Sequence, residues 1–388
     1  MRQTLSDFGS PMPLRVALLT YSTKPRGSVI HTLELAQALA KLGHQPCVFA
    51  LDKDGQGFHR VTPFNTCTVP AAPCDAGLDQ LIQQRIAEFV EFFQGHSEHY
   101  DVYHAQDCLS ANALAILKQQ GRISHFVRTV HHIEEFKSPY LQDCQEKSID
   151  QPDRCLCVSD IWQKALADTY GIQAHRVING VSSRFSTQPN GSETALASAY
   201  SIQAGPVYLT VGGIEPRKNS INLLKAFYQV LLHYPQAQLV IAGGATLFDY
   251  RDYRQQFIEL VDAYDVGNRL VLPGVVRDAD LPALYRLADV FVFPSVQEGW
   301  GLVILEAIAS GLPVLTSHQA PFTEFLSNQD AILVNPDDAD AIASAMVKLL
   351  DPSITHSLVN HSQPILQHYS WQQSAKMHLE LYFELAAE

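Results

Sequence analysis

The stretch PSVQEGWGLVILEAIASGLPV, residues 294–314, decides how the rest of the chain is interpreted. The apolar run at residues 288–293 leads into it and predicts a buried strand. Gly299 and Gly301 bracket a turn, and the following residues predict a short helix that ends at a Gly-x-Pro signal, residues 311–313. The pattern therefore predicts a strand, a glycine turn and a helix in direct succession.

Glu306 is the single charged residue of that predicted helix. On a 3.6-residue period it shares a face with Leu302, Leu305 and Ala309, so its carboxylate points where apolar side chains point. A buried carboxylate is costly unless other groups donate hydrogen bonds to it. Two interpretations follow: a structural pair with a distant arginine, or an acceptor for the hydroxyl groups of a ligand.

The start of the same helix offers a position for an anion. The backbone N–H groups of Gly301, Leu302 and Val303 have no acceptor within a helix. With Glu306 one turn further on, this arrangement suits a nucleotide whose ribose diol donates hydrogen bonds while its diphosphate accepts them. Glu298, just before the turn, is a second carboxylate that we expect to face the same ligand.

A pair of cations follows another predicted strand. The apolar run 206–211 leads into Gly212 and Gly213, and the loop continues to Arg217 and Lys218. Open α/β sheets bind ligands at the carboxyl ends of their strands. The two cations therefore either bind a diphosphate or belong to a solvated basic loop.

These motifs resemble those of the retaining glycosyltransferases of family 4. Glu298 and Glu306 match the two glutamates of the family's Glu-x7-Glu motif, and residues 212–218 match its Gly-x-x-x-x-Arg-Lys element. The opening at residues 26–44 and the Asn-Gly-Val at 179–181 are also similar to family landmarks. One departure is that the family has Gly-Gly where this chain has Arg26-Gly27, which leaves open how the loop approaches the donor.

The resemblance implies an α/β fold with two facing Rossmann-like domains, known as the GT-B type, and a C-terminal helix that crosses back to the first domain. We expect an N-terminal, acceptor-side domain at residues 1–185 and a linker at 186–204. A nucleotide-sugar-binding domain is expected at 205–368, and the returning helix at 369–388.

The resemblance also implies roles for individual residues. A histidine at the matching strand end contacts the donor sugar in the family, and this position is His131. Glu298 would hold the sugar hydroxyls and Glu306 the ribose, and the backbone near Val275 and Val276 would contact the base. The implied catalytic residues are His131, Glu298, Arg217 and Lys218. The implied donor-binding residues are Gly27, Gly213, Val275, Val276, Gly299, Gly301, Leu302, Val303 and Glu306.

The reaction implied is transfer of a sugar from a nucleotide-diphosphate sugar to an acceptor, with the anomeric configuration retained. UDP-sugars are the default within the family, GDP- and ADP-sugars stay open, and the acceptor is a sugar, a lipid or another small molecule. No cofactor or metal is expected, since Arg217 and Lys218 would offset the charge of the leaving diphosphate. Two alternatives remain: a binding module that holds the nucleotide sugar without turnover, and a nucleotide-sugar epimerase of the same fold.

Other polar motifs have competing interpretations. His104 and Asp107 end a predicted strand and either face the acceptor or, for Asp107, cap the next helix. Asp278 and Asp280 superficially match a metal-binding Asp-x-Asp, but capping of a helix by Asp280 explains them better. The His-His-Ile-Glu-Glu run at residues 131–135 lacks the helical His-x3-His spacing of a zinc site.

Length and composition agree with a two-domain globular enzyme. The chain has 388 residues, and its formal charge of −13 without any Lys/Arg block argues against a nucleic-acid partner and allows at most weak membrane attachment. No apolar run approaches the roughly 20 residues that span a bilayer. Residues 1–13 are expected to be a loose leader without the apolar core of a signal peptide. The seven cysteines form no zinc spacing, so a cytoplasmic location is expected.

Overall fold

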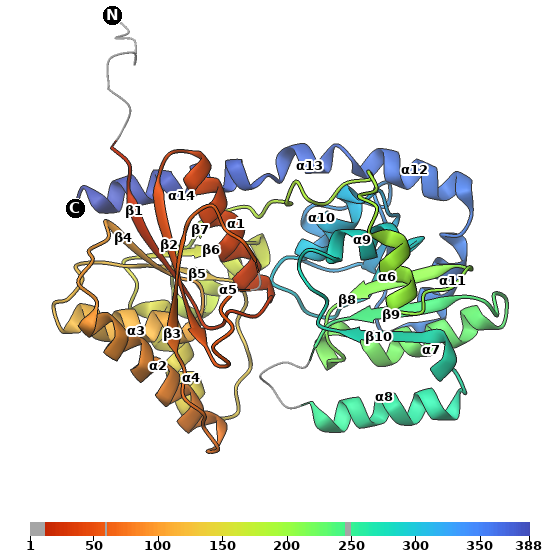
Figure 1. The fold of residues 1–388 in the computed structure, drawn as a ribbon, viewed down its shortest axis with the longest axis horizontal. Coiled ribbons are helices and arrows are strands. Elements are labelled where there is room, and N and C mark those ends of the chain that lie inside the picture. Colours follow the sequence, from red (N-terminus) through yellow and green to blue (C-terminus); the bar gives the residue numbers. More distant parts are fainter. Residues whose placement is uncertain (1–11, 59, 245–249) are drawn as a thin grey trace, which may run out of the picture. The chain divides into compact units, whose positions relative to one another are not determined.

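The computed structural model describes residues 12–58, 60–244 and 250–388 (Figure 1). The expected leader at residues 1–13 lies almost wholly outside the described residues. The described part of the chain divides into two compact units. The first comprises the residues up to Cys157, Ala165–Val177 and Ser374–Glu388, and the second comprises Val158–Lys164 and Ile178–Gln373.

The first unit is built on a parallel sheet with the strand order β3-β2-β1-β4-β5-β6-β7. Its strands are β1 (Arg15–Thr20), β2 (Gln45–Asp52), β3 (Asn65–Pro70), β4 (Val102–Ala105), β5 (Val127–Val130), β6 (Arg154–Cys157) and β7 (His175–Arg176). The helices associated with it are α1 (Gly27–Lys41), α2 (Leu78–Gly95), α3 (Cys108–Gln119), α4 (Pro139–Asp150), α5 (Asp160–Tyr170) and α14 (Trp371–Ala386). Residues 16–19 of β1 are apolar and buried because both faces of a parallel sheet are covered by helices.

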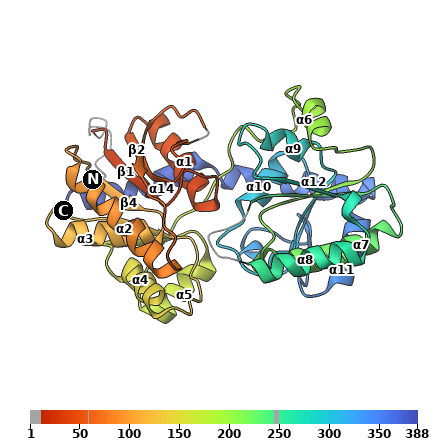
Figure 2. The ribbon, with the colours of Figure 1, turned by 60° about the horizontal axis from the view of Figure 1, so that its bottom comes forward.

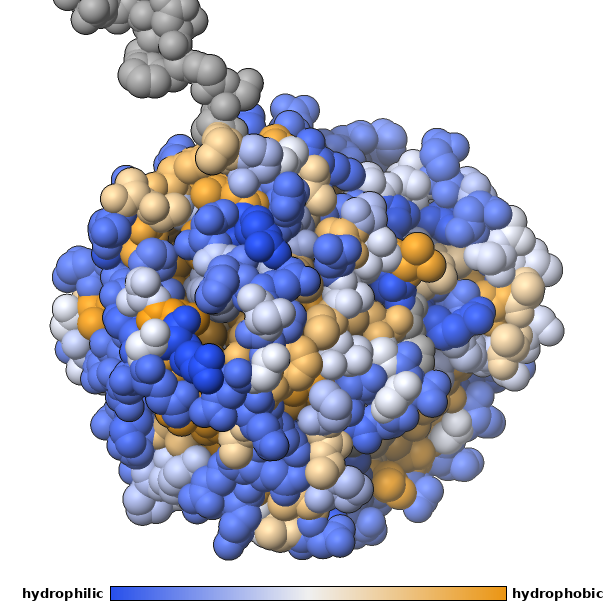
Figure 3. Space-filling view, turned by 60° about the vertical axis from the view of Figure 1, so that its left-hand side comes forward, coloured by the Kyte–Doolittle hydropathy of each residue, from blue (hydrophilic) through white to orange (hydrophobic). Residues whose placement is uncertain are grey.

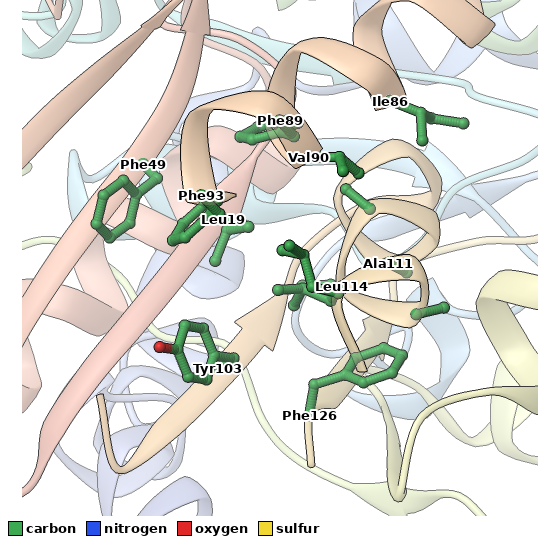
Figure 4. Close-up of a cluster of buried hydrophobic side chains, with 14 of the residues drawn as sticks. Leu19, Phe49, Ile86, Phe89, Val90, Phe93, Tyr103, Ala111, Leu114 and Phe126 are labelled. Carbon is green, nitrogen blue, oxygen red and sulfur yellow. The ribbon is translucent and has the colours of Figure 1, made fainter. Parts of the chain in front are cut away.

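Alternate side chains of these strands pack against different helices. Leu19 and Phe49 face α2 and α3, where they meet Phe89, Phe93 and Leu114 (Figure 4). The rings of Phe49 and Phe93 lie 4.8 Å apart between centroids. The opposite face carries α1 and α14, whose His31 and His378 rings contact each other. The period of two along a strand thus divides this unit into two layers of helices around one sheet.

The second unit repeats this plan with the strand order β10-β9-β8-β11-β12-β13, again with parallel pairings. Its strands are β8 (Val207–Val211), β9 (Gln238–Ala242), β10 (Leu270–Gly274), β11 (Val290–Phe293), β12 (Val314–Ser317) and β13 (Ile332–Val334). Its helices are α6 (Glu193–Ala199), α7 (Ser220–Leu231), α8 (Arg251–Ala263), α9 (Leu281–Arg286), α10 (Leu302–Ala309), α11 (Ala339–Lys348), α12 (Pro352–Ser362) and α13 (Ile365–His368). The α/β fold class predicted from the sequence is confirmed.

Helices lie on both faces of the second sheet (Figures 1 and 2). Leu209 and Phe291 face α9 and α10, whereas their neighbours Tyr208 and Val290 face α7 and α11. The stretch 186–204, expected as a linker, lies inside this unit, where α6 packs on α9 and contributes the buried Leu196 to the core.

The Asn-Gly-Val landmark at 179–181 contacts the segment that leads into the last helix. Val181 forms an isolated parallel bridge with Ser370. A Cβ atom at Gly180 would lie 2.2 Å from the backbone nitrogen of Trp371. Gly180 is therefore required because the two backbones approach too closely for any side chain.

Hydrophilic residues predominate on the face shown in Figure 3, with hydrophobic residues in patches between them. Among the described helices, none combines the length and the apolar character needed to cross a membrane. The seven cysteines all lie in described segments and are free thiols.

Gly180→Ala tests the close approach. The added methyl group has no room beside Trp371, so the free energy of unfolding should fall by about 2 kcal/mol, as overpacking of a rigid site does. Urea unfolding followed by circular dichroism measures the change. Gly95→Ala is the matched control, because a Cβ atom there meets nothing within 4 Å and should change stability by less than about 1 kcal/mol. Equal stability of both variants would contradict the steric role of Gly180.

Candidate functional site

The direction in which strands are added to the second sheet reverses between β8 and β11. The chain runs outward from β8 to β9 and β10, then returns to place β11 on the other side of β8. Crossovers that diverge in this way open a crevice at the carboxyl ends of the two central strands, where open α/β sheets bind ligands. Arg217 and Lys218 follow β8, and Glu298 follows β11, so strand order brings these three predicted site residues to one place.

The three side chains form an ion cluster in which Glu298 and Lys218 are largely buried and Arg217 is partly exposed. Lys218 Nζ lies 2.5 Å from Glu298 Oε1, and Arg217 Nη1 lies 3.1 and 3.2 Å from the two carboxylate oxygens. Burial raises the pKa of Glu298, but the charges of Lys218 and Arg217 outweigh it and hold that pKa below its ordinary value. Glu298 is therefore an ionised carboxylate.

Sequence analysis did not identify Glu215 and Ser295 as members of this cluster. Glu215 is buried and its Oε2 lies 3.1 Å from Arg217 Nε. Ser295 Oγ lies 2.7 Å from Glu298 Oε1 and 2.6 Å from the carbonyl oxygen of Arg217. The one available signal for Glu215 was its place beside two cations in the same loop; nothing local marked Ser295.

The loops that carry the cluster are fixed by backbone contacts. The N–H of Val296 donates to the carbonyl oxygen of Arg217 at 2.8 Å, and Trp162 Nε1 donates to that of Glu298 at 3.1 Å. Gly212 has a φ of +152°, and a Cβ atom there would lie 3.0 Å from Lys218 Cε. Glycine at this position therefore lets the Lys218 side chain lie flat along the end of β8.

The glycine-rich segments that follow β8, β9 and β10 approach one another closely. A Cβ atom at Gly213 would lie 2.6 Å from the carbonyl oxygen of Gly244, and one at Gly244 would lie 2.5 Å from Val275 Cγ2. Two of the predicted donor-binding residues, Gly213 and Val275, are thus brought together through Gly244. Val275 is exposed, whereas its neighbour Val276 is buried in the core.

The predicted turn and helix of residues 299–309 form as expected. Gly301 precedes α10 with a φ of +123°, which residues with a side chain rarely adopt. Between Gly299 and Gly301, the buried Trp300 stacks on Phe325 at 4.6 Å between ring centroids. Among the described residues, no acceptor is recorded for the N–H of Leu302 or Val303, as the first turn of a helix requires. These N–H groups can donate to an anion.

Glu306 is buried on α10, and Tyr285 on α9 donates a hydrogen bond to its Oε2 at 2.8 Å. Burial, together with the adjacent Glu306, raises the pKa of Tyr285 well above its ordinary value, so the phenol keeps its proton and remains the donor. The structure therefore places a tyrosine hydroxyl among the donors to this carboxylate. Nothing in the sequence marked Tyr285, which lies 21 residues away.

His131 belongs to a buried polar network in the first unit. Its Nε2 lies 3.1 Å from Gln106 Oε1. The ring also meets His31 of α1 edge to face, at 4.8 Å between centroids. Burial, followed by the nearby His31 and Arg128, lowers the pKa of His131 well below its ordinary value. The imidazole is therefore neutral.

The same network reaches the last helix. His104 Nδ1 lies 2.6 Å from the Tyr382 hydroxyl, and His378 packs on the His104 ring at 5.7 Å between centroids. His104 is fully buried. Asp107 caps α3 by accepting from the Ser110 N–H at 2.9 Å, which is the capping interpretation. Gly27 begins α1, and a Cβ atom there would meet nothing within 4 Å.

The aspartates of the Asp-x-Asp run are held by arginines. Asp278 pairs with Arg184. Asp280 stands at the N-cap position of α9, but its carboxylate accepts from Arg277 Nε at 2.6 Å instead of making the expected capping bond. The neighbouring guanidinium is charged, which makes it a stronger donor than a backbone N–H. Within the described residues no group of three or more His, Cys, Asp or Glu side chains is placed to hold a metal ion.

Two protein families match this chain. The family described as Glycosyltransferase Family 4 matches residues 25–184, and the family described as Glycosyl transferases group 1 matches residues 195–360. The two matches together span most of the chain and include both units. The chain belongs to the group 1 glycosyltransferases.

Individual relatives of this group 1 glycosyltransferase match over most of their length. A phosphatidyl-myo-inositol mannosyltransferase from Mycolicibacterium smegmatis is 27% identical over 367 residues, which is 89% of this chain and 87% of the relative. The solved sucrose-phosphate synthase from Thermosynechococcus elongatus superposes with a TM-score of 0.79 at 24% identity, covering 96% of this chain and 99% of that one. An Anabaena protein solved in complex with UDP-glucose gives 0.76 at 18% identity, covering 96% and 100%. The two solved structures show a shared fold.

Stability of this glycosyltransferase should fall in mild acid because its buried histidines are neutral. Burial lowers the pKa of His378 to about 4 from an ordinary 6.5. Between these values the unfolded chain binds a proton that the folded chain excludes, so the free energy of unfolding decreases as the pH falls. The loss is about 1.4 kcal/mol per pH unit for one such group, about 3 kcal/mol in all.

Urea unfolding at pH 7.5 and pH 5.0 measures this loss, and His378→Gln provides the comparison. The variant should lose less stability between the two pH values than the native chain does. An equal loss in both would show that His378 does not contribute to the pH dependence.

Proposed function

We propose that this glycosyltransferase transfers a sugar from a nucleotide-diphosphate sugar, with UDP-sugars the first candidates, to a sugar, lipid or other small-molecule acceptor. The observation that carries the proposal is the ion cluster of Arg217, Lys218 and Glu298 at the crevice between β8 and β11, beside the first turn of α10. The Anabaena protein of the same fold, solved with UDP-glucose, supports the choice of UDP.

The chemical role of the cluster is electrostatic. As the bond between the anomeric carbon and the diphosphate breaks, negative charge accumulates on the leaving phosphate oxygens. Arg217, Lys218 and the N–H groups of Gly301, Leu302 and Val303 stabilise that charge, so that no divalent metal and no cofactor is required. Fixed donors of this kind each contribute a few kcal/mol in a site from which water is excluded.

We further propose that the anomeric configuration is retained through attack from the face that the diphosphate leaves. The acceptor oxygen forms its bond to the anomeric carbon as the carbon–phosphate oxygen bond breaks, and the acceptor's proton passes to the leaving phosphate. Glu298 binds sugar hydroxyls, Glu306 the ribose diol, and Gly213, Val275 and Val276 the region of the nucleotide. For His131 and Gly27, the family resemblance supports roles in contacting the donor sugar and in binding the donor.

Incubation of the purified chain with UDP-, GDP- and ADP-sugars and a mixed pool of sugar and lipid acceptors tests the proposal. We expect free nucleoside diphosphate together with a glycosylated acceptor, at a rate that excess EDTA leaves unchanged within about twofold. An isomerised sugar nucleotide would instead identify an epimerase, and binding without turnover would identify a silent module. Complete loss of transfer in EDTA, restored by added metal, would contradict the metal-free mechanism.

The role of Glu306 is tested separately. Glu306→Gln keeps the side-chain volume but reduces its capacity to accept hydrogen bonds, so affinity for the bound nucleoside diphosphate should fall about tenfold, the usual effect of losing one hydrogen bond to a charged group. Isothermal titration calorimetry measures the affinity. Tyr285→Phe is the matched control, because it removes the partner of Glu306 while leaving the carboxylate for the ribose. Native affinity of Glu306→Gln would restore the purely structural interpretation of this residue.

A further inference from the structure

The cations proposed to bind the diphosphate are already bonded to carboxylates of the chain itself. Lys218 Nζ and Arg217 Nη1 both contact Glu298, and Arg217 Nε contacts Glu215. In this cluster of described residues two positive charges therefore face two negative ones. Its local charge is balanced before any ligand contributes.

Burial strengthens the electrostatic interactions among these four charges. The side chains of Glu298 and Lys218 are 10% and 13% exposed, so water does little to screen their contact of 2.5 Å. Glu215 is 3% exposed, whereas Arg217 retains 34% of its side-chain surface. A phosphate that approaches Lys218 must therefore come close to the Glu298 carboxylate, and charges of the same sign in such a site repel strongly.

We propose that Glu298 is an internal counterion that competes with the diphosphate for Lys218 and Arg217, and thereby makes the site select an intact nucleotide sugar over a bare nucleoside diphosphate. This inference rests on the proposed function. The sugar hydroxyls of an intact donor donate hydrogen bonds to Glu298. These bonds replace the contacts with Lys218 and Arg217 that Glu298 loses when the diphosphate binds. A nucleoside diphosphate lacks these hydroxyls, so its phosphates meet an uncompensated carboxylate.

The same exchange has a consequence for turnover. When the sugar leaves for the acceptor, Glu298 loses its hydroxyl donors and returns to Lys218 and Arg217. The carboxylate then weakens the hold of the two cations on the diphosphate. Release of the product is thus coupled to the loss of the sugar, by the same three side chains that bind the donor.

Glu298→Gln separates charge from shape. The glutamine keeps the volume and both polar positions but removes the negative charge. Calorimetric titration with UDP, GDP and ADP identifies the diphosphate that the native chain binds most tightly. That diphosphate should bind to Glu298→Gln about tenfold more tightly or better, as expected for removal of a like charge from a poorly screened site. The corresponding nucleotide sugar should gain less, because its contact with the carboxylate is lost.

Glu215→Gln is the matched control. It removes the negative charge that contacts Arg217 Nε and leaves the contact between Lys218 and Glu298 intact. Its gain in diphosphate affinity should stay below about threefold. Circular dichroism and thermal unfolding verify that each variant is folded, and Glu298→Ala replaces the glutamine variant if the latter does not fold.

The outcomes distinguish this inference from the function on which it rests. If the native chain binds none of the three diphosphates and none of the corresponding nucleotide sugars, the proposed function fails. If it binds one of the diphosphates and Glu298→Gln binds that diphosphate no more tightly, the counterion role is overturned while the proposed function stands. An equal gain in Glu298→Gln and Glu215→Gln would assign the effect to net charge and would also overturn it.

Discussion

The contact between one buried carboxylate and two cations is the interaction on which the second unit depends. Glu298 is ionised beneath the surface because Lys218 and Arg217 lie within hydrogen-bond distance of it. Removing either partner would leave a buried charge uncompensated, which is among the most destabilising changes a protein can undergo. The loops after β8 and β11 are consequently held together by the same groups that face the ligand crevice, so stability and chemistry share one set of side chains.

Strand order is what brings those loops together. In both sheets the first strand of the unit lies in the middle, and the chain winds outward on one side before it returns to the other. The polar residues of each unit collect at the carboxyl ends beside this change of direction. Glycines at Gly212 and Gly213 then let side chains and backbones approach where a Cβ atom would collide. Sheet topology and small residues together create room for a charged group in an otherwise apolar layer.

The first unit shows a different solution to burying polar groups. The imidazoles of His104 and His131 are neutral, and they are joined to Gln106, Thr129 and Tyr382 by hydrogen bonds. Neutrality avoids the cost of an unpaired charge, at the expense of tolerance to acid. Because His378 and Tyr382 come from α14, the final helix contributes polar groups to this network in addition to apolar packing.

Local sequence determined the elements and the family. The alternation of apolar runs with glycine turns predicted α10 and the strand before it, and the spacing of Glu298 and Glu306 and of Arg217 and Lys218 pointed to the glycosyltransferase motifs. These signals are local because helix period and turn chemistry involve residues a few positions apart. Only the tertiary structure decided which partners meet: Lys218 with Glu298, Tyr285 with Glu306, and His31 with His378. It also placed residues 186–204 within the second unit. Such pairings depend on strand order and on the packing of elements up to hundreds of residues apart, and no local pattern encodes them.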